Sequence, residues 1–316
     1  GVQTCALPIL MFKYNCLNPI ASVGLDLFSN DYEKVEDLGQ ADAALVRSAA
    51  MHDLELPDCL LAVARAGAGV NNIPLDKCAE KGIVVFNTPG ANANGVKELV
   101  FAGMLYASRD IVGGIDWCLA NQNDENIAKT AEKQKKNFAG TEISGKKLGV
   151  IGLGAIGFAF AKMAQGFGMH VLAYSRHKKT GAEYDFIEQV SLDELLARSD
   201  FISLHTPHTP ATEHMIDQDT IARMKDGVIL INTARGALID EQALADALAS
   251  GKVLAAGLDV LTDEPPVCGS PLLTAPNTVI TGHIAWLTRE SRIRAIDMAI
   301  DNFRCYLEGH PVSIIN

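Results

Sequence analysis

The stretch Gly145–Gly157, GKKLGVIGLGAIG, decides the fold because an apolar run leads directly into three spaced glycines. KLGVIG predicts a buried strand, and FAFAKMAQGFG just after it predicts a helix. A G-x-G-x-x-G placed between a strand and a helix is typical of dinucleotide binding. Gly152 would make the turn, Gly154 would admit the pyrophosphate, and Gly157 would let helix and strand pack closely. A plain strand-to-helix turn is the alternative.

The chain around this stretch alternates buried strands with helices. The expected strands are KLGVIG, HVLAYS, DFISLH, GVILINT, VLAAGLDV and NTVITG, and helical patterns such as DEQALADALASGK lie between them. This alternation predicts an α/β fold with a doubly wound parallel sheet. We therefore expect residues 97–286 to form an NAD(P)-binding Rossmann domain.

The first third of the chain predicts a second α/β domain. FKYNCLN, DAALVRS, CLLAVARAGAG and GIVVFNTP read as short strands. The last helix, roughly Thr288–Glu308, is expected to return to this domain. Residues 11–96 and 287–316 are thus predicted to form a smaller, flavodoxin-like doubly wound substrate domain. From Gly95 a long helical pattern, NGVKELVFAGMLYASRDIVGGIDWCLA, would cross between domains or pack against a second subunit, which favours a homodimer.

Composition excludes several classes of partner. The 316 residues carry a net charge of −11, which disfavours nucleic acid and anionic lipid, and no apolar run approaches the roughly 20 residues that span a membrane. The seven cysteines are scattered, which favours a reducing cytoplasm. Residues 1–10, GVQTCALPIL, are predicted to be a non-native leader, because the codons that would encode GVQTCALPI match a common sequencing adaptor. A genuine N-terminal tail is the alternative.

The end of the strand HVLAYS bears on the choice of nucleotide. NAD-selective sites place Asp or Glu here for the ribose 2′-hydroxyl, whereas this chain has Ser175 and Arg176. These residue types suit a 2′-phosphate, although an arginine can also lie against the adenine. The pattern therefore leaves NAD and NADP equally open.

Three residues at or just beyond strand ends could oxidise a 2-hydroxy acid. Arg235 could hold the carboxylate, His283 could take the hydroxyl proton, and Glu264 could orient that imidazole. Each also has a simple structural interpretation, as a surface ion pair, a turn cap or a core histidine. The histidines of HTPHTPATEH raise the question of zinc, but no Cys or acidic pattern accompanies them, so no metal is predicted.

Several ordered motifs resemble those of the D-isomer-specific 2-hydroxyacid dehydrogenases: RAGAGVNN, NTPGANANGVKEL, GVIGLGAIG, HTPHTPATEHMI, INTARG, AAGLDVLTDEP and GHIAWLT. The resemblance implies that Arg235, Glu264 and His283 are catalytic and that a small 2-hydroxy or 2-oxo acid is the substrate. Ala68 and Gly69 would receive its carboxylate, and Asp259 would contact the nicotinamide. The full set expected to line the cofactor is Gly152, Gly154, Ala155, Ile156, Gly157, Ser175, Arg176, His205, Thr206, Pro207, Thr212, Thr233, Ala234 and Asp259.

The motifs resemble two branches of that family. Up to about Gly157 they are similar to D-3-phosphoglycerate dehydrogenase, and afterwards to glycerate dehydrogenase (hydroxypyruvate reductase). This change of resemblance predicts that the chain is either a natural mosaic or a join of two genes. Arg47 and Arg65 match arginines that meet a phosphorylated substrate, which favours 3-phosphoglycerate and serine biosynthesis, although salt bridges would also explain them.

Three further expectations follow from this resemblance. A non-catalytic NAD(H)-sensing protein of the same fold is the rival from another class. The chain ends at GHPVSIIN, so serine feedback through a C-terminal regulatory domain is not expected. Gly282 stands where the family usually has proline, and Gly282→Pro is expected to leave activity equal or higher.

Overall fold

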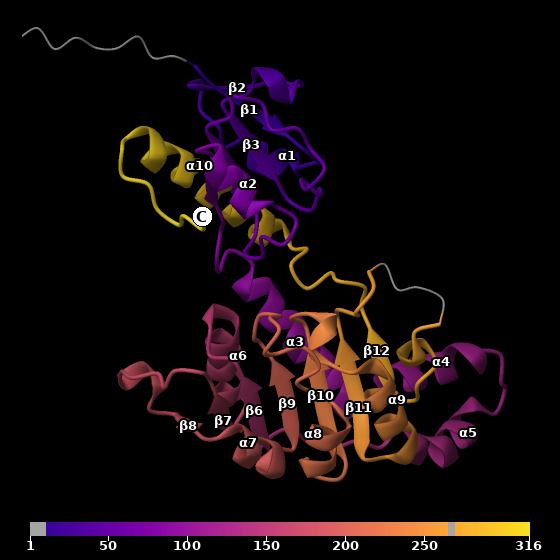
Figure 1. Ribbon diagram of the computed structural model, residues 1–316. Coiled ribbons are helices and arrows are strands. Elements are labelled where there is room, and N and C mark those ends of the chain that lie inside the picture. Colours follow the sequence, from indigo (N-terminus) through magenta and orange to yellow (C-terminus); the bar gives the residue numbers. More distant parts are fainter. Residues whose placement is uncertain (1–10, 265–268) are drawn as a thin grey trace, which may run out of the picture. The chain divides into compact units, whose positions relative to one another are not determined.

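The computed structural model describes residues 11–264 and 269–316 (Figure 1). The expected non-native leader, residues 1–10, lies outside the described residues. The chain divides into two compact units. One contains the residues up to Gly95 together with Trp286–Asn316, and the other is Val96–Ala285.

The first unit is built on a parallel sheet of five strands in the order β2-β1-β3-β4-β5. Its elements are β1 (Phe12–Cys16), α1 (Ser22–Leu25), β2 (Tyr32–Lys34), β3 (Ala43–Val46), β4 (Ala62–Arg65), α2 (Leu75–Glu80), β5 (Val84–Phe86) and α10 (Arg289–Leu307). This strand order is that of flavodoxin-like folds, which confirms the predicted class. The sequence patterns missed β2, a three-residue edge strand with no buried residue.

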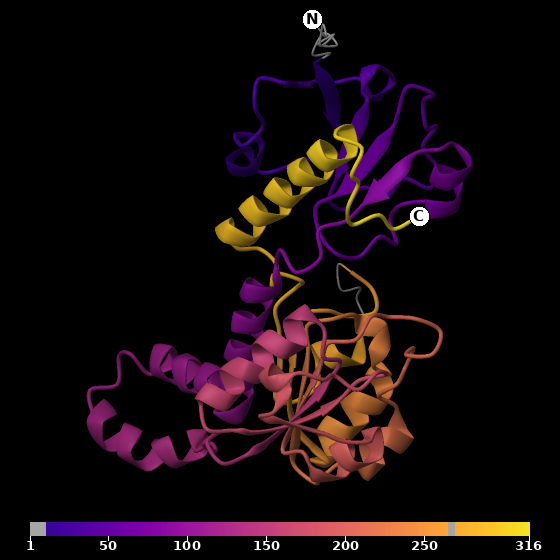
Figure 2. The same ribbon diagram turned by 90° about the vertical axis from the view of Figure 1, so that its left-hand side faces the viewer.

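Helix α10 covers one side of this sheet, and Figure 2 shows it in yellow against the indigo strands. The Thr288 side chain caps its first turn by accepting the Ser291 N–H. Ile296, Ala299 and Phe303 on α10 are buried in one cluster with β1, β3, β4 and β5. The Phe303 ring lies 5.7 Å from that of Phe12. The expected return of the last helix to the first part of the chain is therefore seen.

The second unit has a seven-stranded parallel sheet in the order β12-β11-β10-β9-β6-β7-β8. Its strands are β6 (Lys147–Ile151), β7 (His170–Tyr174), β8 (Ile187–Gln189), β9 (Phe201–Leu204), β10 (Val228–Asn232), β11 (Val253–Leu258) and β12 (Thr278–Ile280). Its α-helices are α3 (Ala93–Ser108), which begins before the unit boundary, α4 (Ile111–Ala120), α5 (Ile127–Gln134), α6 (Ala155–Gly166), α7 (Leu192–Arg198), α8 (Gln218–Arg223) and α9 (Glu241–Ser250). The order reverses between β6 and β9, as in Rossmann folds. The short edge strand β8 was not predicted.

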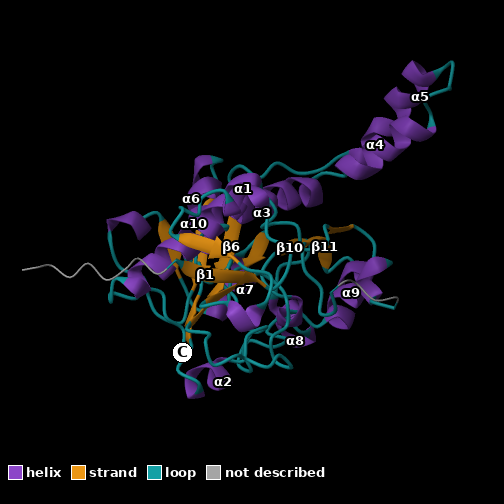
Figure 3. Ribbon diagram, turned by 90° about the horizontal axis from the view of Figure 1, so that it is seen from above, coloured by secondary structure: helices purple, strands orange, loops and turns teal. Residues whose placement is uncertain are grey.

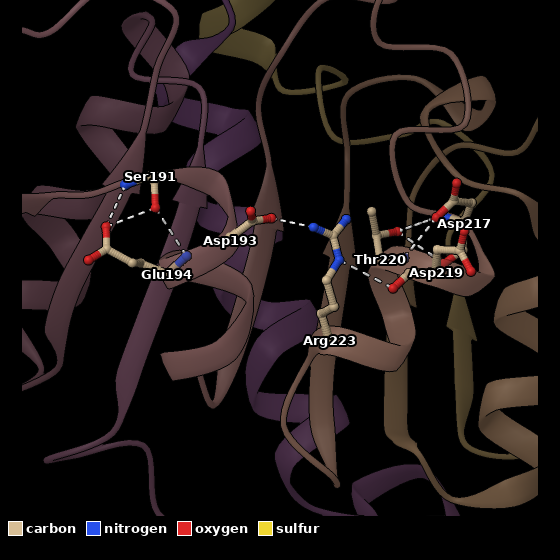
Figure 4. Close-up of polar contacts among 7 residues, drawn as sticks. All are labelled: Ser191, Asp193, Glu194, Asp217, Asp219, Thr220 and Arg223. Atoms are coloured by element: carbon tan, nitrogen blue, oxygen red, sulfur yellow. Dashed lines mark hydrogen bonds and ion pairs between the residues drawn. The ribbon is translucent and has the colours of Figure 1, made fainter.

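Helices α7 and α8 begin with capping boxes, which Figure 4 shows side by side. Ser191 and Glu194 satisfy each other's backbone N–H groups at α7, and Asp217 and Thr220 do so at α8. Such boxes satisfy backbone donors that helices otherwise leave unpaired. An ion pair between Arg223 and Asp193 joins the two helices.

The long helix expected from Gly95 is two helices, which corrects the prediction. Helix α3 ends at Ser108, and α4 starts after Asp110, whose carboxylate accepts the Gly113 N–H. The side chain thus starts a new helix where the apolar pattern continues unbroken. Figure 3 shows α4 and α5 extending away from the sheet of their unit. Among the described residues, no helix is long and apolar enough to cross a membrane.

Candidate active site

The predicted cofactor and catalytic residues of the second unit gather at one edge of its sheet. Gly152 follows β6, Ser175 follows β7, His205 follows β9, and Asp259 follows β11. Because all seven strands are parallel, these positions lie at the carboxyl edge, where ligands bind in open α/β sheets.

The glycine loop has the shape that a pyrophosphate needs. A Cβ on Gly152, which has φ +103°, would lie 2.7 Å from the His205 carbonyl oxygen, and one on Gly157 would lie 2.0 Å from that of Gly152. Gly154 is exposed, and a Cβ there would meet nothing within 4 Å. No side chain caps α6, so the N–H groups of its first turn, from Ala155 and Ile156 onward, are available to an anion. The residues present therefore fit a dinucleotide.

His205 packs against the glycine loop and helix α6. Its ring lies 5.6 Å from the Phe160 ring of α6, and its Nε2 shares a hydrogen bond of 2.9 Å with the Ser203 hydroxyl. Removal from water lowers the pKa of His205 to about 4. Its imidazole is thus neutral near neutral pH, and its backbone N–H donates to Ile151 at the end of β6. The backbone and Cβ of His205, rather than its ring, lie closest to the glycine loop.

The segment after His205 is held by its own side chains. The Thr212 hydroxyl donates to the Pro207 carbonyl at 2.8 Å and accepts the Thr209 N–H. Thr206 is partly buried, and Pro207 is exposed. Thr212 therefore fixes the loop that carries Thr206 and Pro207, two of the predicted cofactor residues.

The loop that carries Arg235 is fixed by a buried amide. Asn232, at the end of β10, accepts the Ala234 N–H and donates to the Arg235 carbonyl at 2.8 Å. A Cβ on Gly236 would lie 1.9 Å from the Leu261 carbonyl carbon. This glycine therefore lets the loop that carries Thr233, Ala234 and Arg235 pass against the one that leads to Glu264.

Glu264 and His283 form a hydrogen-bonded pair, as the acid–imidazole prediction requires. The Nδ1 atom of His283 lies 2.5 Å from Oε2 of Glu264, and the two side chains are 42% and 34% exposed. The second ring nitrogen, Nε2, has no hydrogen-bond partner among the residues that the structure describes. The carboxylate thus fixes the ring orientation and leaves Nε2 available to a substrate.

Asp259 holds the backbone on which His283 stands. Its buried carboxylate accepts the Thr281 hydroxyl at 2.6 Å and the N–H groups of Ile284 at 2.8 Å and Ala285 at 2.9 Å. Its own carbonyl accepts the His283 N–H. Both carboxylate oxygens are therefore used within the loop, which we define as the histidine loop, residues 281–285.

The backbone of the histidine loop changes one expectation. Gly282 has φ +65° and His283 has φ +60°, so two successive residues are left-handed. Proline fixes φ near −65° and cannot take the conformation of Gly282. Proline therefore does not fit this backbone, and we now expect Gly282→Pro to lower activity.

The predicted substrate residues belong to the first unit. The Arg47 guanidinium lies over the Trp286 ring, 5.0 Å from its centroid. Arg65 folds over the next turn, since a Cβ on Gly67 would lie 1.3 Å from its Nη1. Asn87 donates to the Ala68 carbonyl at 2.8 Å, and this steadies the loop that contains Ala68 and Gly69. Among the residues that the structure describes, the ion pairs do not include Arg47.

Several supporting residues escaped the sequence-based prediction: Asn87, Ser203, Asn232, Thr281 and Trp286. Asn232 and Trp286 lie within the quoted motifs INTARG and GHIAWLT, so motif membership was an available signal. Ser203 has no such signal. Across residues 11–264 and 269–316, no group of three or more His, Cys, Asp or Glu side chains could hold a metal ion.

Comparison with known proteins identifies the family. The profile for "D-isomer specific 2-hydroxyacid dehydrogenase, NAD binding domain" matches residues 101–285. The chain belongs to the D-isomer-specific 2-hydroxyacid dehydrogenases. This D-2-hydroxyacid dehydrogenase is therefore an oxidoreductase acting on a CH–OH donor, and its cofactor is a nicotinamide dinucleotide, NAD or NADP.

Its relatives carry more than one name. It is 43% identical to the hydroxypyruvate reductase of Thermotoga maritima over 279 residues, which cover 85% of this chain and 87% of that protein. It is 42% identical to the D-3-phosphoglycerate dehydrogenase of Mycobacterium leprae over 86% of this chain, which spans only 50% of that protein. A glyoxylate reductase structure from Paecilomyes thermophila is similar with a TM-score of 0.82 at 30% identity, over 98% of this chain and 99% of that one.

Proposed function

We propose that Arg235, Glu264 and His283 perform the family's hydride-transfer reaction in this chain. The Glu264–His283 hydrogen bond of 2.5 Å is the observation that carries the proposal. A nicotinamide dinucleotide held by the glycine loop, residues 152–157, would supply the hydride chemistry at C2 of the acid. The residues of this chain must therefore move one proton and hold one carboxylate.

His283 is the proton carrier. Because Nδ1–H donates to Glu264, the lone pair of the neutral ring lies on Nε2. In the oxidative direction Nε2 takes the hydroxyl proton, and in the reductive direction it returns that proton to the forming alkoxide. The Glu264 carboxylate stabilises the resulting imidazolium without moving.

Arg235 supplies the positive charge. Its guanidinium is a planar fork that suits a carboxylate, and Nη1 donates to the Ala234 carbonyl, which limits its freedom. The fork would hold the substrate carboxylate and polarise the C2 oxygen. We also assign the 11–96 and 287–316 portion the role of substrate domain and the 97–286 portion that of cofactor domain.

For the substrate we propose D-3-phosphoglycerate. Its oxidation would be the first step of serine biosynthesis in the cytoplasm. Arg47 and Arg65 support this choice. The Arg47 guanidinium lies over the Trp286 ring, and no ion pair of the described residues uses its N–H groups, which leaves them to meet a phosphate. Arg65 lies against the turn before Ala68 and Gly69, the expected carboxylate-binding backbone.

Glycerate with hydroxypyruvate is the second candidate. It is favoured by the 43% identity to the Thermotoga hydroxypyruvate reductase, which this chain matches over most of both lengths. An unphosphorylated acid would not need both arginines. The two candidates therefore differ in the response to losing Arg47 and Arg65.

The test is a steady-state matrix of NADH and NADPH against hydroxypyruvate and 3-phosphohydroxypyruvate. Arg235→Ala and His283→Ala should each lower turnover by roughly 100-fold or more with either acid. Arg47→Ala and Arg65→Ala should raise KM for the phosphorylated acid alone. Arg223→Ala, which breaks a surface ion pair, is the matched control and should change neither the turnover nor the KM for either acid. Unchanged turnover in His283→Ala would refute the catalytic assignment and favour a nucleotide-sensing protein.

A homodimer is proposed from the face of α4. Ile111, Val112, Ile115 and Leu119 are 37%, 46%, 51% and 61% exposed, and α4 buries no residue. Their spacing places them along the helix, where a second copy would remove them from water. Ile115→Lys with Leu119→Lys should convert a dimer into a monomer in sedimentation. A wild-type monomer at micromolar concentration would overturn the proposal.

A further inference from the structure

The loop after β7 concentrates positive charge beside the dinucleotide loop. Residues 175–179, SRHKK, are here named the cationic loop. The loop starts next to the pyrophosphate-binding turn, because the Gly152 N–H donates to the Tyr174 carbonyl at 2.8 Å. Its position is therefore the one at which a Rossmann fold meets the adenosine ribose.

The backbone of the cationic loop is held at both ends. The Ser175 hydroxyl donates to the His177 carbonyl at 2.8 Å. At the other end, the Gln189 side chain both accepts the Lys179 N–H at 2.8 Å and donates to the Lys179 carbonyl at 2.7 Å. Gln189 is the last residue of β8, which pairs with β7. The loop thus presents its side chains from a prepared backbone.

The charges of the cationic loop are not neutralised locally. Arg176, His177 and Lys178 are exposed, and none of them takes part in an ion pair of the described residues. Residues 175–179 include no carboxylate that could accept from a ribose 2′-hydroxyl. The acid on neighbouring β8, Glu188, already receives both Nη atoms of Arg198 at 2.8 Å. A positive site therefore stands out on a protein with a net charge of −11.

We infer that the cationic loop binds the 2′-phosphate of NADP(H), with Arg176 as its principal ligand, and that this enzyme prefers NADP(H) to NAD(H). The inference deepens the proposed function and rests on it. A doubly charged phosphate gains charge-assisted hydrogen bonds from the guanidinium, whereas a ribose hydroxyl finds no acceptor there. A carboxylate introduced at Ser175 should reverse the preference by repelling that phosphate.

The test measures binding without catalysis. Isothermal titration of the full chain with 2′,5′-ADP and with 5′-AMP isolates the 2′-phosphate, and NADPH and NADH follow. We expect 2′,5′-ADP to bind roughly 10- to 100-fold more tightly than 5′-AMP. Arg176→Ala should remove most of that ratio, and Ser175→Asp should invert it. Arg223→Ala, the same residue type elsewhere in this unit, should leave it unchanged.

The outcomes separate the two levels of the proposal. If NADH and NADPH bind equally in the wild-type chain, the nucleotide preference is wrong while the proposed reaction stands. If Arg176→Ala weakens 5′-AMP as much as 2′,5′-ADP, Arg176 lies against the adenine and the phosphate assignment is overturned. If no nucleotide binds at all, the proposed function fails as well.

Discussion

Gly282 tests whether a left-handed backbone carries the catalytic histidine. The residue has φ +65°, and His283 follows with φ +60°. Proline at this position needs φ near −65°, so the backbone would rotate by about 130°, the difference between +65° and −65°. The N–H groups of Ile284 and Ala285, which Asp259 binds, follow immediately. We expect Gly282→Pro to break these bonds and displace the imidazole.

The size of the effect follows from the local geometry. A Cβ on residue 282 meets nothing within 4 Å, so Gly282→Ala adds only left-handed strain, about 1–2 kcal/mol. If the loop relaxes to escape that strain, kcat/KM falls by roughly 5- to 30-fold. Gly282→Pro removes the positioned base altogether, which predicts a loss of about 100-fold or more.

The assay is NAD(P)H oxidation by the preferred 2-oxo acid, with thermal unfolding as the check on folding. Gly251→Ala is the matched control, because Gly251 also has a left-handed φ of +78° and open space around its Cβ. Gly251 ends α9 ahead of β11, at the opposite edge of the sheet from His283. The Gly251→Ala substitution should lower the melting temperature without changing kcat/KM. A folded Gly282→Pro enzyme with wild-type turnover would refute the reasoning.

Three further predictions concern the same unit. Because the pKa of His205 falls to about 4 in the folded protein, the unfolded chain binds the extra proton between that pH and about 6.5. Stability should therefore fall as pH drops through this window, by at most about 3 kcal/mol, and urea midpoints of His205→Gln should show a smaller dependence. Asp259→Asn places an amide against the backbone N–H groups of Ile284 and Ala285, which the carboxylate accepts. We expect this variant to lower kcat by roughly tenfold with little change in the Kd of the nucleotide. A large rise in that Kd would instead favour direct contact between Asp259 and the nicotinamide. Gly154 has φ −79° and open space around its Cβ position, so Gly154→Ala should not change the melting temperature. The added methyl should weaken NAD(P)H binding by about tenfold, because it stands where the pyrophosphate approaches the backbone. Unchanged binding in a titration would show that the pyrophosphate lies elsewhere.

The main elements could be predicted because the physics that forms them is local. Parallel strands covered on both faces read as continuous apolar runs, so β6, β9 and β10 are visible in the sequence. The three-residue edge strands β2 and β8 are not, because each has at most one buried residue. The break between α3 and α4 was also missed, since the apolar pattern continues across it and only the Asp110 cap marks it.

The sequence by itself determined the two sheets, the glycine loop and the residue types of the catalytic set, because periodicity and motif spacing are properties of neighbouring residues. The tertiary structure alone decided how those residues are held. Asp259 binds residues 22 to 26 positions away, and the Arg47 guanidinium lies over the ring of Trp286, which is far from it in the sequence. It also gave Gly282 the left-handed conformation that rules out proline. Such contacts form only when folding brings together residues that are distant in the sequence.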